Sequence, residues 1–243
     1  MYLPDVLRLP LTSVIGDTCY TSLVENLNYQ DVDCLKYSVS KGLGLGIVLG
    51  GSIVKVPQIM TIVSHGSAQG LSLSSYIIET LAYTITLAYN IRQHNPFSTF
   101  GEIMFITLQN LVIIGLIASY GKEAWKALPA FVLLGCTFYA LQDASLLPWS
   151  IVQSCYAATI PLSLASKVPQ ILTNWRNGST GRLSVFTVMN YFLGSAARVF
   201  TTMTELNDPL MLWGNLLATS LNFILVLQVA LYWGNSTPKE KTA

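Results

Sequence analysis

The sequence predicts an all-α polytopic membrane protein with seven transmembrane helices, arranged as two parallel three-helix repeats joined by a linker helix. Three observations lead to this fold class. The 243-residue chain is 52% hydrophobic and only 10% charged, whereas a soluble domain carries about 25% charged residues. Apolar stretches of about 20 residues, long enough to cross a bilayer, recur along the chain. A phrase in the first half of the chain also returns 112 residues later.

The apolar stretches define the expected helices. We place the seven spans at residues 41–63, 71–91, 99–119, 127–143, 149–173, 184–204 and 211–233. The fourth stretch is the shortest, so an arrangement with six spans is the alternative. The corresponding organisation is an N-terminal segment 1–38, a first repeat 39–119, a linker helix with its loops 120–148, a second repeat 149–233 and a tail 234–243.

The internal repeat sets the symmetry of the predicted bundle. The phrase KVPQIMTIVSHGSAQGLS, residues 55–72, returns as KVPQILTNWRNGSTGRLS, residues 167–184. The same offset pairs Asn110 with Asn222, so the register holds through the third helix of each repeat. Because one linker helix separates the repeats, both enter the membrane in the same direction, as in transporters with a central site. A duplication kept only for packing is the alternative.

Each repeat places a proline and a glutamine inside its first predicted helix: Pro57 with Gln58, and Pro169 with Gln170. Proline removes a backbone hydrogen bond and kinks a regular helix at a cost of about 3 kcal/mol. Polar side chains can satisfy the freed carbonyl groups in a membrane bundle, and the adjacent glutamines are the nearest candidates. We interpret the two motifs as hinges in equivalent helices, with a static kink as the alternative.

The first predicted span also carries a stripe of small residues. Gly42, Gly46 and Gly50 follow one another at four-residue spacing, which places them on one face of a helix. Small residues let helices approach closely in membranes. The stripe therefore predicts a helix-packing surface.

Five ionisable side chains fall within the predicted spans: Lys55, Glu79, Glu102, Lys167 and Arg198. A charge at the centre of a transmembrane helix costs roughly 2.5–3.5 kcal/mol, so each is a candidate for function. The two lysines are equivalent in the repeat, and snorkelling to the headgroups is their alternative role. A guanidinium suits phosphate because it binds two oxygens at once, although Arg198 could instead pair with one of the acids. Three cations and two acids leave one positive charge, which an anionic ligand or water in a cavity would balance.

Charge distribution predicts the orientation. Six basic residues lie on one predicted side and four on the other: Lys122, Lys126, Arg176, Arg182, Lys239 and Lys241 against Arg8, Lys36, Lys41 and Arg92. The positive-inside rule then places the C-terminus in the cytosol and the N-terminus in the lumen. Cys19 and Cys34 would lie in that oxidising lumen, as a disulfide or as two free thiols. The ending KEKTA, with Lys239 and Lys241, resembles a retrieval signal of the endoplasmic reticulum.

Other classes of function find little support in the sequence. A net charge of +1 gives no basic field for nucleic acid. The two histidines, His65 and His94, lie far apart in the sequence, so they form neither a metal site nor a catalytic base cluster. We therefore expect neither an enzyme nor a cofactor.

The paired KVPQ segments in a three-plus-one-plus-three chain resemble the PQ-loop membrane proteins, relatives of the SWEET sugar transporters and cystinosin. Within that family, SKGLGLGIV before the first motif and GSAARVFTTMTELNDPLM after the second resemble the mannose-phosphate-dolichol utilization defect proteins. This resemblance implies a non-enzymatic membrane protein of the endoplasmic reticulum. It would be needed to use dolichol-phosphate-mannose and dolichol-phosphate-glucose as lumenal sugar donors for N-glycans and GPI anchors, by flipping or presenting the lipid.

The resemblance also assigns roles to residues. Lys55, Lys167 and Arg198 would attract the phosphate, and Glu79 is placed with them among the substrate-binding residues. Asn110 and Asn222 would line the sugar path, because an amide offers donors and an acceptor to hydroxyl groups; an interhelical hydrogen bond is the alternative. Membrane lipid and lumenal glycosyltransferases are the implied partners. The alternatives are a transporter of a small soluble sugar or amino acid, and a scaffold for glycosyltransferases.

Overall fold

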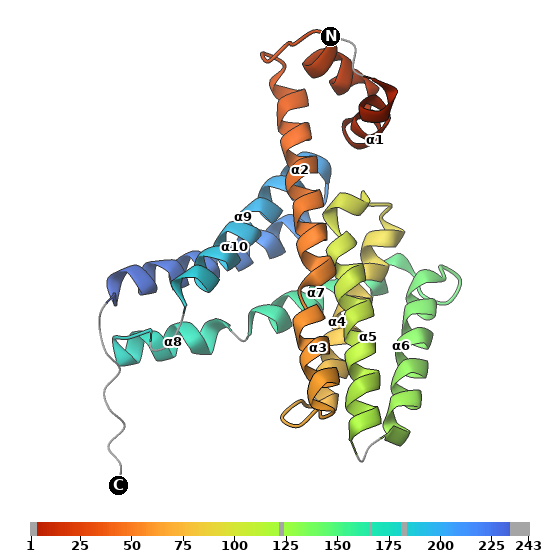
Figure 1. Cartoon of the computed structure of the whole chain (residues 1–243), viewed down its shortest axis with the longest axis vertical. Helices are drawn as coiled ribbons and strands as arrows, with labels where there is room; N and C mark the ends of the chain where they lie inside the picture. Colours follow the sequence, from red (N-terminus) through yellow and green to blue (C-terminus); the bar gives the residue numbers. More distant parts are fainter. Residues whose placement is uncertain (1–3, 122–123, 166, 181–183, 234–243) are drawn as a thin grey trace. The chain divides into compact units, whose positions relative to one another are not determined.

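The computed structural model describes residues 4–121, 124–165, 167–180 and 184–233, and the regular elements in them are helical (Figure 1). The chain divides into two compact units. Unit one contains Met1–Gly44 and Ile160–Ala243, and unit two contains Leu45–Thr159. Three described stretches have the length and composition to cross a membrane, and a fourth apolar helix is shorter: Val32–His65, Gly101–Tyr120 and Pro209–Leu231, then Ala127–Gln142.

Unit two is built around a group of adjacent helices, in which α4 packs against both α5 and α6 (Figure 1). Its elements are the end of α2 (Val32–Ile53), α3 (Val56–His65), α4 (Leu73–Arg92), α5 (Gly101–Tyr120), α6 (Ala127–Gln142) and most of α7 (Trp149–Leu164), with 3-10 turns at Phe97–Thr99 and Ala124–Lys126. The buried core contains Ile62, Leu73, Ile113, Ile114, Ile117 and Leu134. Aliphatic residues from α3, α4, α5 and α6 thus join these helices into one unit.

An aromatic and polar cluster closes one end of unit two. The fully buried ring of Tyr89 stacks on Trp149 and Tyr156, with centroids 5.0 and 4.1 Å apart. The Arg92 guanidinium donates two hydrogen bonds of 3.0 Å to the carbonyls of Leu141 and Leu147. These contacts attach α4 to the end of α6 and to the beginning of α7.

Unit one contains a helical hairpin of α9 (Val185–Glu205) and α10 (Pro209–Leu231). The sequence explains the turn, because Asp208 caps α10 by accepting hydrogen bonds from the amides of Leu210 and Met211, at 2.9 and 3.1 Å. Pro209 occupies the first helical position, where no amide hydrogen is needed. The other elements are α1 (Asp5–Tyr20), the π-helical turn Thr21–Glu25, the start of α2, the end of α7 and α8 (Lys167–Asn177).

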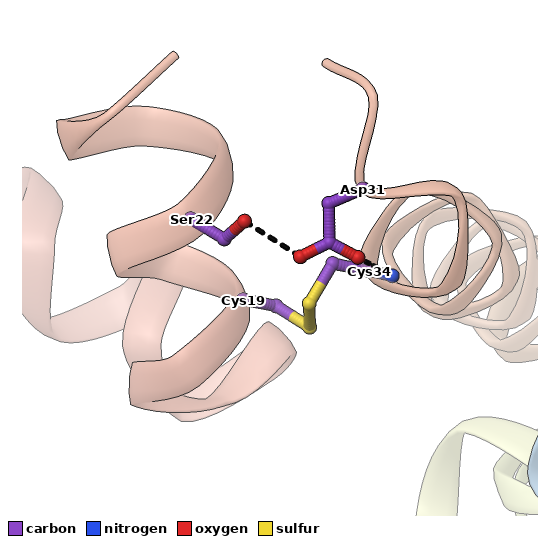
Figure 2. The surroundings of a disulfide bond; sticks show 4 residues. All are labelled: Cys19, Ser22, Asp31 and Cys34. Carbon is purple, nitrogen blue, oxygen red and sulfur yellow. Dashed lines mark hydrogen bonds between the residues drawn. A yellow bond between two sulfur atoms is a disulfide. The ribbon is translucent and has the colours of Figure 1, made fainter. Parts of the chain in front are cut away.

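A disulfide between Cys19 and Cys34 joins the N-terminal helices to the start of α2 (Figure 2). Asp31 lies beside it and accepts hydrogen bonds from the Ser22 hydroxyl, at 2.6 Å, and from the Cys34 amide, at 3.1 Å. These two hydrogen bonds, the Ser22 one foremost, lower the pKa of Asp31 below its ordinary value. Helix α2 begins at Val32, within the segment that we had expected to precede the first repeat.

The repeat holds in the backbone at single-residue resolution. Ser72 caps α4 and Ser184 caps α9, each by accepting a hydrogen bond from the amide three residues later. Gly66 and Gly178 follow α3 and α8 with φ of 58° and 55°, a left-handed conformation that favours glycine. All these positions differ by 112 residues, so the sequence offset corresponds to a repeated fold.

The first helix of each repeat is interrupted just before the proline motif. Helix α2 ends at Ile53 and α3 begins at Val56, while α7 ends at Leu164 and α8 begins at Lys167. Pro57 and Pro169 therefore lie in the first turn of a new helix, where proline fits because its missing amide would have no helical partner. The structure shows two breaks in place of two kinked helices, and bending at these breaks stays a prediction.

The expected glycine stripe packs against no other described helix of its own unit, and its role as a packing surface stays a prediction. A methyl group added at Gly42, Gly46 or Gly50 would meet no atom of its own unit within 4 Å beyond its own helix. The close approach lies one residue later, at Gly51. An added Cβ there would be 2.4 Å from Cβ of Glu102 on α5. Within unit two, the face of α2 that packs against α5 therefore begins one residue after the predicted stripe.

Candidate functional site

Lys55 of unit two is neutralised by an acid. Its ammonium lies 2.9 Å from both carboxylate oxygens of Glu79 on α4 and 5.0 Å from the ring centroid of Tyr76. The Tyr83 hydroxyl donates a hydrogen bond of 3.2 Å to the same carboxylate. The Lys55 and Glu79 side chains are 17% and 37% exposed, so the pair lies at the edge of the packed interior. The structure thus brings together two of the predicted site residues.

Gln109 of α5 forms hydrogen bonds with the backbone on both sides of the break between α2 and α3. Its side-chain oxygen accepts a hydrogen bond of 2.8 Å from the Lys55 amide, and its nitrogen donates one of 2.8 Å to the Gly51 carbonyl. In an unbroken α-helix the Lys55 amide and the Gly51 carbonyl would bond directly. The amide of Gln109 is inserted between them, so it, and not the predicted Gln58, satisfies the backbone groups at the break.

Lys167 of unit one has a different environment. Its ammonium donates to the Asn222 side-chain oxygen on α10 and lies 5.0 Å from the ring centroid of Tyr191 on α9. The Asn222 nitrogen donates to the Tyr191 carbonyl at 3.0 Å and to the Ser195 hydroxyl at 2.9 Å. Within the described parts of the chain, Lys167 has no carboxylate partner. Its charge is therefore not balanced by an acid there.

The repeat register explains this difference. The position equivalent to Glu79 is Tyr191, so the second repeat lacks the acid that neutralises Lys55. Aligning the two repeats beyond the KVPQ phrase would have revealed the substitution. Sequence reasoning treated the two lysines as equivalent, whereas one belongs to an ion pair and the other is a half-buried cation held by an amide.

The two predicted asparagines also differ. Asn222 is buried and uses both ends of its amide. Asn110 is fully buried, yet neither its oxygen nor its nitrogen has a hydrogen-bond partner among the residues described. A buried polar group without a partner costs about 1–3 kcal/mol. Asn110 is therefore an amide that is buried at a cost in free energy.

Arg198 lies on α9, half-buried, and takes no part in the hydrogen bonds around Lys167. Sequence reasoning missed a buried ion pair of unit one. The Lys41 ammonium lies 2.6 Å from Glu205, and the two side chains are 10% and 1% exposed. The Ser40 hydroxyl donates a hydrogen bond of 2.6 Å to the same carboxylate. This pair joins the start of α2 to the end of α9; we had counted Lys41 only as a loop charge.

The remaining predicted residues belong to the motifs and the tail. Pro57, Gln58, Pro169 and Gln170 all lie in the first turns of α3 and α8. The retrieval-signal lysines, Lys239 and Lys241, lie outside the described residues.

Comparison with known proteins agrees with this architecture. Residues 39–99 and 151–211 each match the PQ loop repeat, and together they make up half of the chain with the same 112-residue offset. Human solute carrier family 66 member 3 is 26% identical over 179 residues, covering 74% of this chain and 87% of that protein. A eukaryotic SWEET transporter of known structure matches with a TM-score of 0.66 and 19% identity, covering 84% of this chain and 99% of that one.

These matches confirm the predicted all-α membrane fold and its two PQ-loop repeats. The likeness to the SWEET transporter concerns the fold alone, since the sequences are only 19% identical. The two matched segments, in contrast, contain both proline motifs and both lysines of the candidate site. The chain belongs to the PQ-loop repeat family of membrane proteins.

Proposed function

We propose that this protein is a non-enzymatic handler of lipid-linked sugars in the endoplasmic reticulum membrane, which flips or presents dolichol-phosphate-mannose and dolichol-phosphate-glucose. The observation that carries the proposal is the Lys167 ammonium, which is half-buried and lacks an acid partner among the described residues. A charge removed from water is costly unless an opposite charge compensates it. A phosphate oxygen would supply that charge.

The surroundings of Lys167 suit a phosphate that carries a sugar. The Asn222 oxygen accepts a hydrogen bond from the ammonium, and its second lone pair could accept one from a sugar hydroxyl. Lys55 is less suited to the phosphate, because Glu79 already balances its charge. We therefore assign the phosphate to Lys167, with Arg198 as a second cation, and expect Lys55 to contribute less.

The proposed location rests on two further features. The lysines of the KEKTA ending, Lys239 and Lys241, support retrieval to the endoplasmic reticulum. The disulfide between Cys19 and Cys34 supports an oxidising compartment, hence the lumen, for the N-terminal side. Glycosyltransferases on the lumenal face would then receive the presented lipid.

The test is transbilayer exchange of a fluorescent short-chain dolichyl-phosphate-mannose analogue in proteoliposomes. Wild type, Lys167→Met and Lys55→Met are compared at matched protein density, with folding checked by circular dichroism. We expect fast exchange for wild type, a large loss for Lys167→Met and a smaller one for Lys55→Met. Exchange no faster than in empty vesicles would exclude flipping. Equal losses in the two variants would contradict the role given to Lys167.

A second candidate is a transporter of a small soluble sugar or amino acid, favoured by the fold shared with the SWEET transporter and by the similarity to a solute carrier. The same vesicles distinguish it, through uptake of radiolabelled mannose, glucose or amino acids in place of lipid exchange. A scaffold for glycosyltransferases would show neither activity, and Lys167→Met would leave lumenal mannosylation in cells unchanged.

A further inference from the structure

The two units hold the same lysine and asparagine in two different arrangements. In unit one, Lys167 binds Asn222, and the Asn222 amide is satisfied at both ends. In unit two, Lys55 binds Glu79 and leaves Asn110 buried without a hydrogen-bond partner. The lysines are equivalent in the repeat, and so are the asparagines. Unit one therefore shows a second binding position for the lysine, on the asparagine side chain. Unit two contains the equivalent asparagine, Asn110, but its lysine does not occupy that position.

The equivalence of the two repeats implies that the unused position is within reach of Lys55. The Lys55 amide is hydrogen-bonded to Gln109, the residue before Asn110 on α5. The break between α2 and α3 thus holds the base of the lysine side chain against this part of α5. In unit one the equivalent lysine spans the corresponding distance from α8 to α10. A change of side-chain rotamer is the movement that the comparison requires.

We propose that Glu79 is a proton-binding site, and that its protonation transfers the Lys55 ammonium from Glu79 to Asn110. The carboxylate takes up one proton and becomes a neutral acid, while the lysine keeps its own proton throughout. The ion pair is then lost, and the Asn110 oxygen is the nearest vacant acceptor indicated by the repeat. The Glu79 side chain is 37% exposed, so a proton can reach it.

The Lys55 ammonium and the Tyr83 hydroxyl are the groups in contact with the Glu79 carboxylate. The charged and titratable groups on its own helix and on the elements packed against it are Lys55, Tyr76, Tyr83, Tyr89, Arg92, His65, Glu102, Tyr120, Cys136, Tyr139, Cys155 and Tyr156. Helix α6 contains no Asp, Glu, Lys, Arg or His between Ala127 and Gln142. Arg92 is bound to backbone carbonyls at the far end of α4. Lys55 is therefore the cation that responds when the Glu79 carboxylate is neutralised.

Protonation would also make unit two resemble unit one. Lys55 would then lie on an asparagine without a balancing acid, as Lys167 does. The site would carry one additional positive charge, which an anionic ligand would offset. This last step rests on the proposed function and predicts that the phosphate-bearing ligand and a proton bind together, whereas the movement of Lys55 requires no ligand.

The experiment measures thermal unfolding of the purified protein in detergent, without any ligand. Asn110→Leu removes the vacant amide while keeping the number and branching of the side-chain heavy atoms, and Glu79→Gln imitates the protonated acid. We expect Asn110→Leu to leave Tm unchanged or raised in the wild-type background at neutral pH. In the Glu79→Gln background, the same change should lower Tm by about 2–8 °C, because Lys55 then depends on Asn110.

Controls separate this effect from general destabilisation. Asn222→Leu should lower Tm in both backgrounds, and Glu102→Gln should not make Asn110→Leu harmful. If Glu79→Gln does not fold, the pH dependence of the Asn110→Leu effect replaces it, since acidification of the otherwise wild-type protein should convert a neutral change into a harmful one. An Asn110→Leu effect that is equal in every background and at every pH would overturn the proposal. Because no lipid is present, this outcome is independent of the exchange assay.

Discussion

The contact between Gly51 and Glu102 leads to a sharp prediction about packing. A methyl group at position 51 would lie 2.4 Å from Cβ and 2.9 Å from Cα of Glu102, whereas ordinary contacts begin at 3.4 Å. Gly51→Ala therefore requires α2 and α5 to separate by about 1 Å, and overpacking of this kind costs about 1–3 kcal/mol. Separation also weakens the hydrogen bond from Gln109 to the Gly51 carbonyl, worth about 0.5–1.5 kcal/mol.

One term opposes these costs. Alanine is better than glycine inside a helix by about 0.8–1.0 kcal/mol. The net destabilisation is then about 1–3 kcal/mol, which lowers Tm by about 2–12 °C for a chain of this size. Circular dichroism of the purified variant in detergent measures the shift.

Gly50→Ala is the matched control for this variant. It introduces the same methyl group in the same helix, one residue earlier, where no atom of unit two lies within 4 Å beyond the helix itself. Only the gain in helix propensity applies, so Tm should stay constant or rise by about 2–4 °C. Equal shifts for the two variants, in either direction, would refute the close crossing of α2 and α5 at Gly51.

Three further predictions concern buried polar groups and the N-terminal disulfide. Glu205→Ala should cost about 3–5 kcal/mol, because it leaves the Lys41 ammonium buried without its acid, and combining it with Lys41→Met should recover much of the lost Tm. Gln109→Leu should cost about 1–3 kcal/mol by leaving backbone groups unsatisfied at the helix break, and hydrogen exchange should increase first at the amides of that break. Asp31 has a lowered pKa in the folded chain, so its contribution to stability is complete above its ordinary pKa of about 3.8 and is lost as the pH falls through the lower folded value. Acidification should therefore lower the protection factor of the Cys34 amide in the wild type, that is, its protection relative to the intrinsic exchange rate at the same pH. Asp31→Asn should make that protection factor independent of pH over the same range.

The fold could be predicted from the sequence because it depends on local features that can be read from composition and residue spacing. Apolar stretches, capping serines and left-handed glycines all recur with one offset, and each is a local requirement of the chain. The broken first helices were predicted only as kinks. A proline favours a helix start as well as a kink, and the choice depends on which side chain satisfies the freed backbone groups. Here that side chain is Gln109, whose role requires knowledge of which helix lies opposite.

The candidate site was predicted less completely for a similar reason. Lys55 and Lys167 open the same KVPQ phrase, and their different environments depend on partners 24 and 55 residues away. The glycines show the same limit. Adjacent residues of a helix point about 100° apart, so the correct spacing of Gly42, Gly46 and Gly50 could not show that the neighbouring Gly51 faces α5.

The broken helices of the two repeats are stabilised at different points by hydrogen bonds from side chains. This difference predicts where the protein bends. In unit two, Gln109 bridges the backbone at the break itself. The equivalent position in unit one is Leu221, whose side chain cannot form such a bridge. In unit one, α8 is instead held to α10 beyond the first turn of α8. There Gln228 donates to the Ile171 carbonyl at 2.8 Å and accepts from Asn174 at 3.0 Å.

A break whose backbone is bridged by a side chain resists bending more than one braced farther along the helix. The two proline motifs, identical in sequence, should therefore differ in stiffness, with motion concentrated between α7 and α8. That junction also carries Lys167, the cation to which we assign the phosphate. Leu221→Gln, which would supply the missing bridge, should then slow lipid exchange without removing Lys167. Gln109→Leu should change the exchange rate less, although it costs more stability. If the two variants altered exchange in proportion to their loss of stability, bending at α7–α8 would have no separate role in transport.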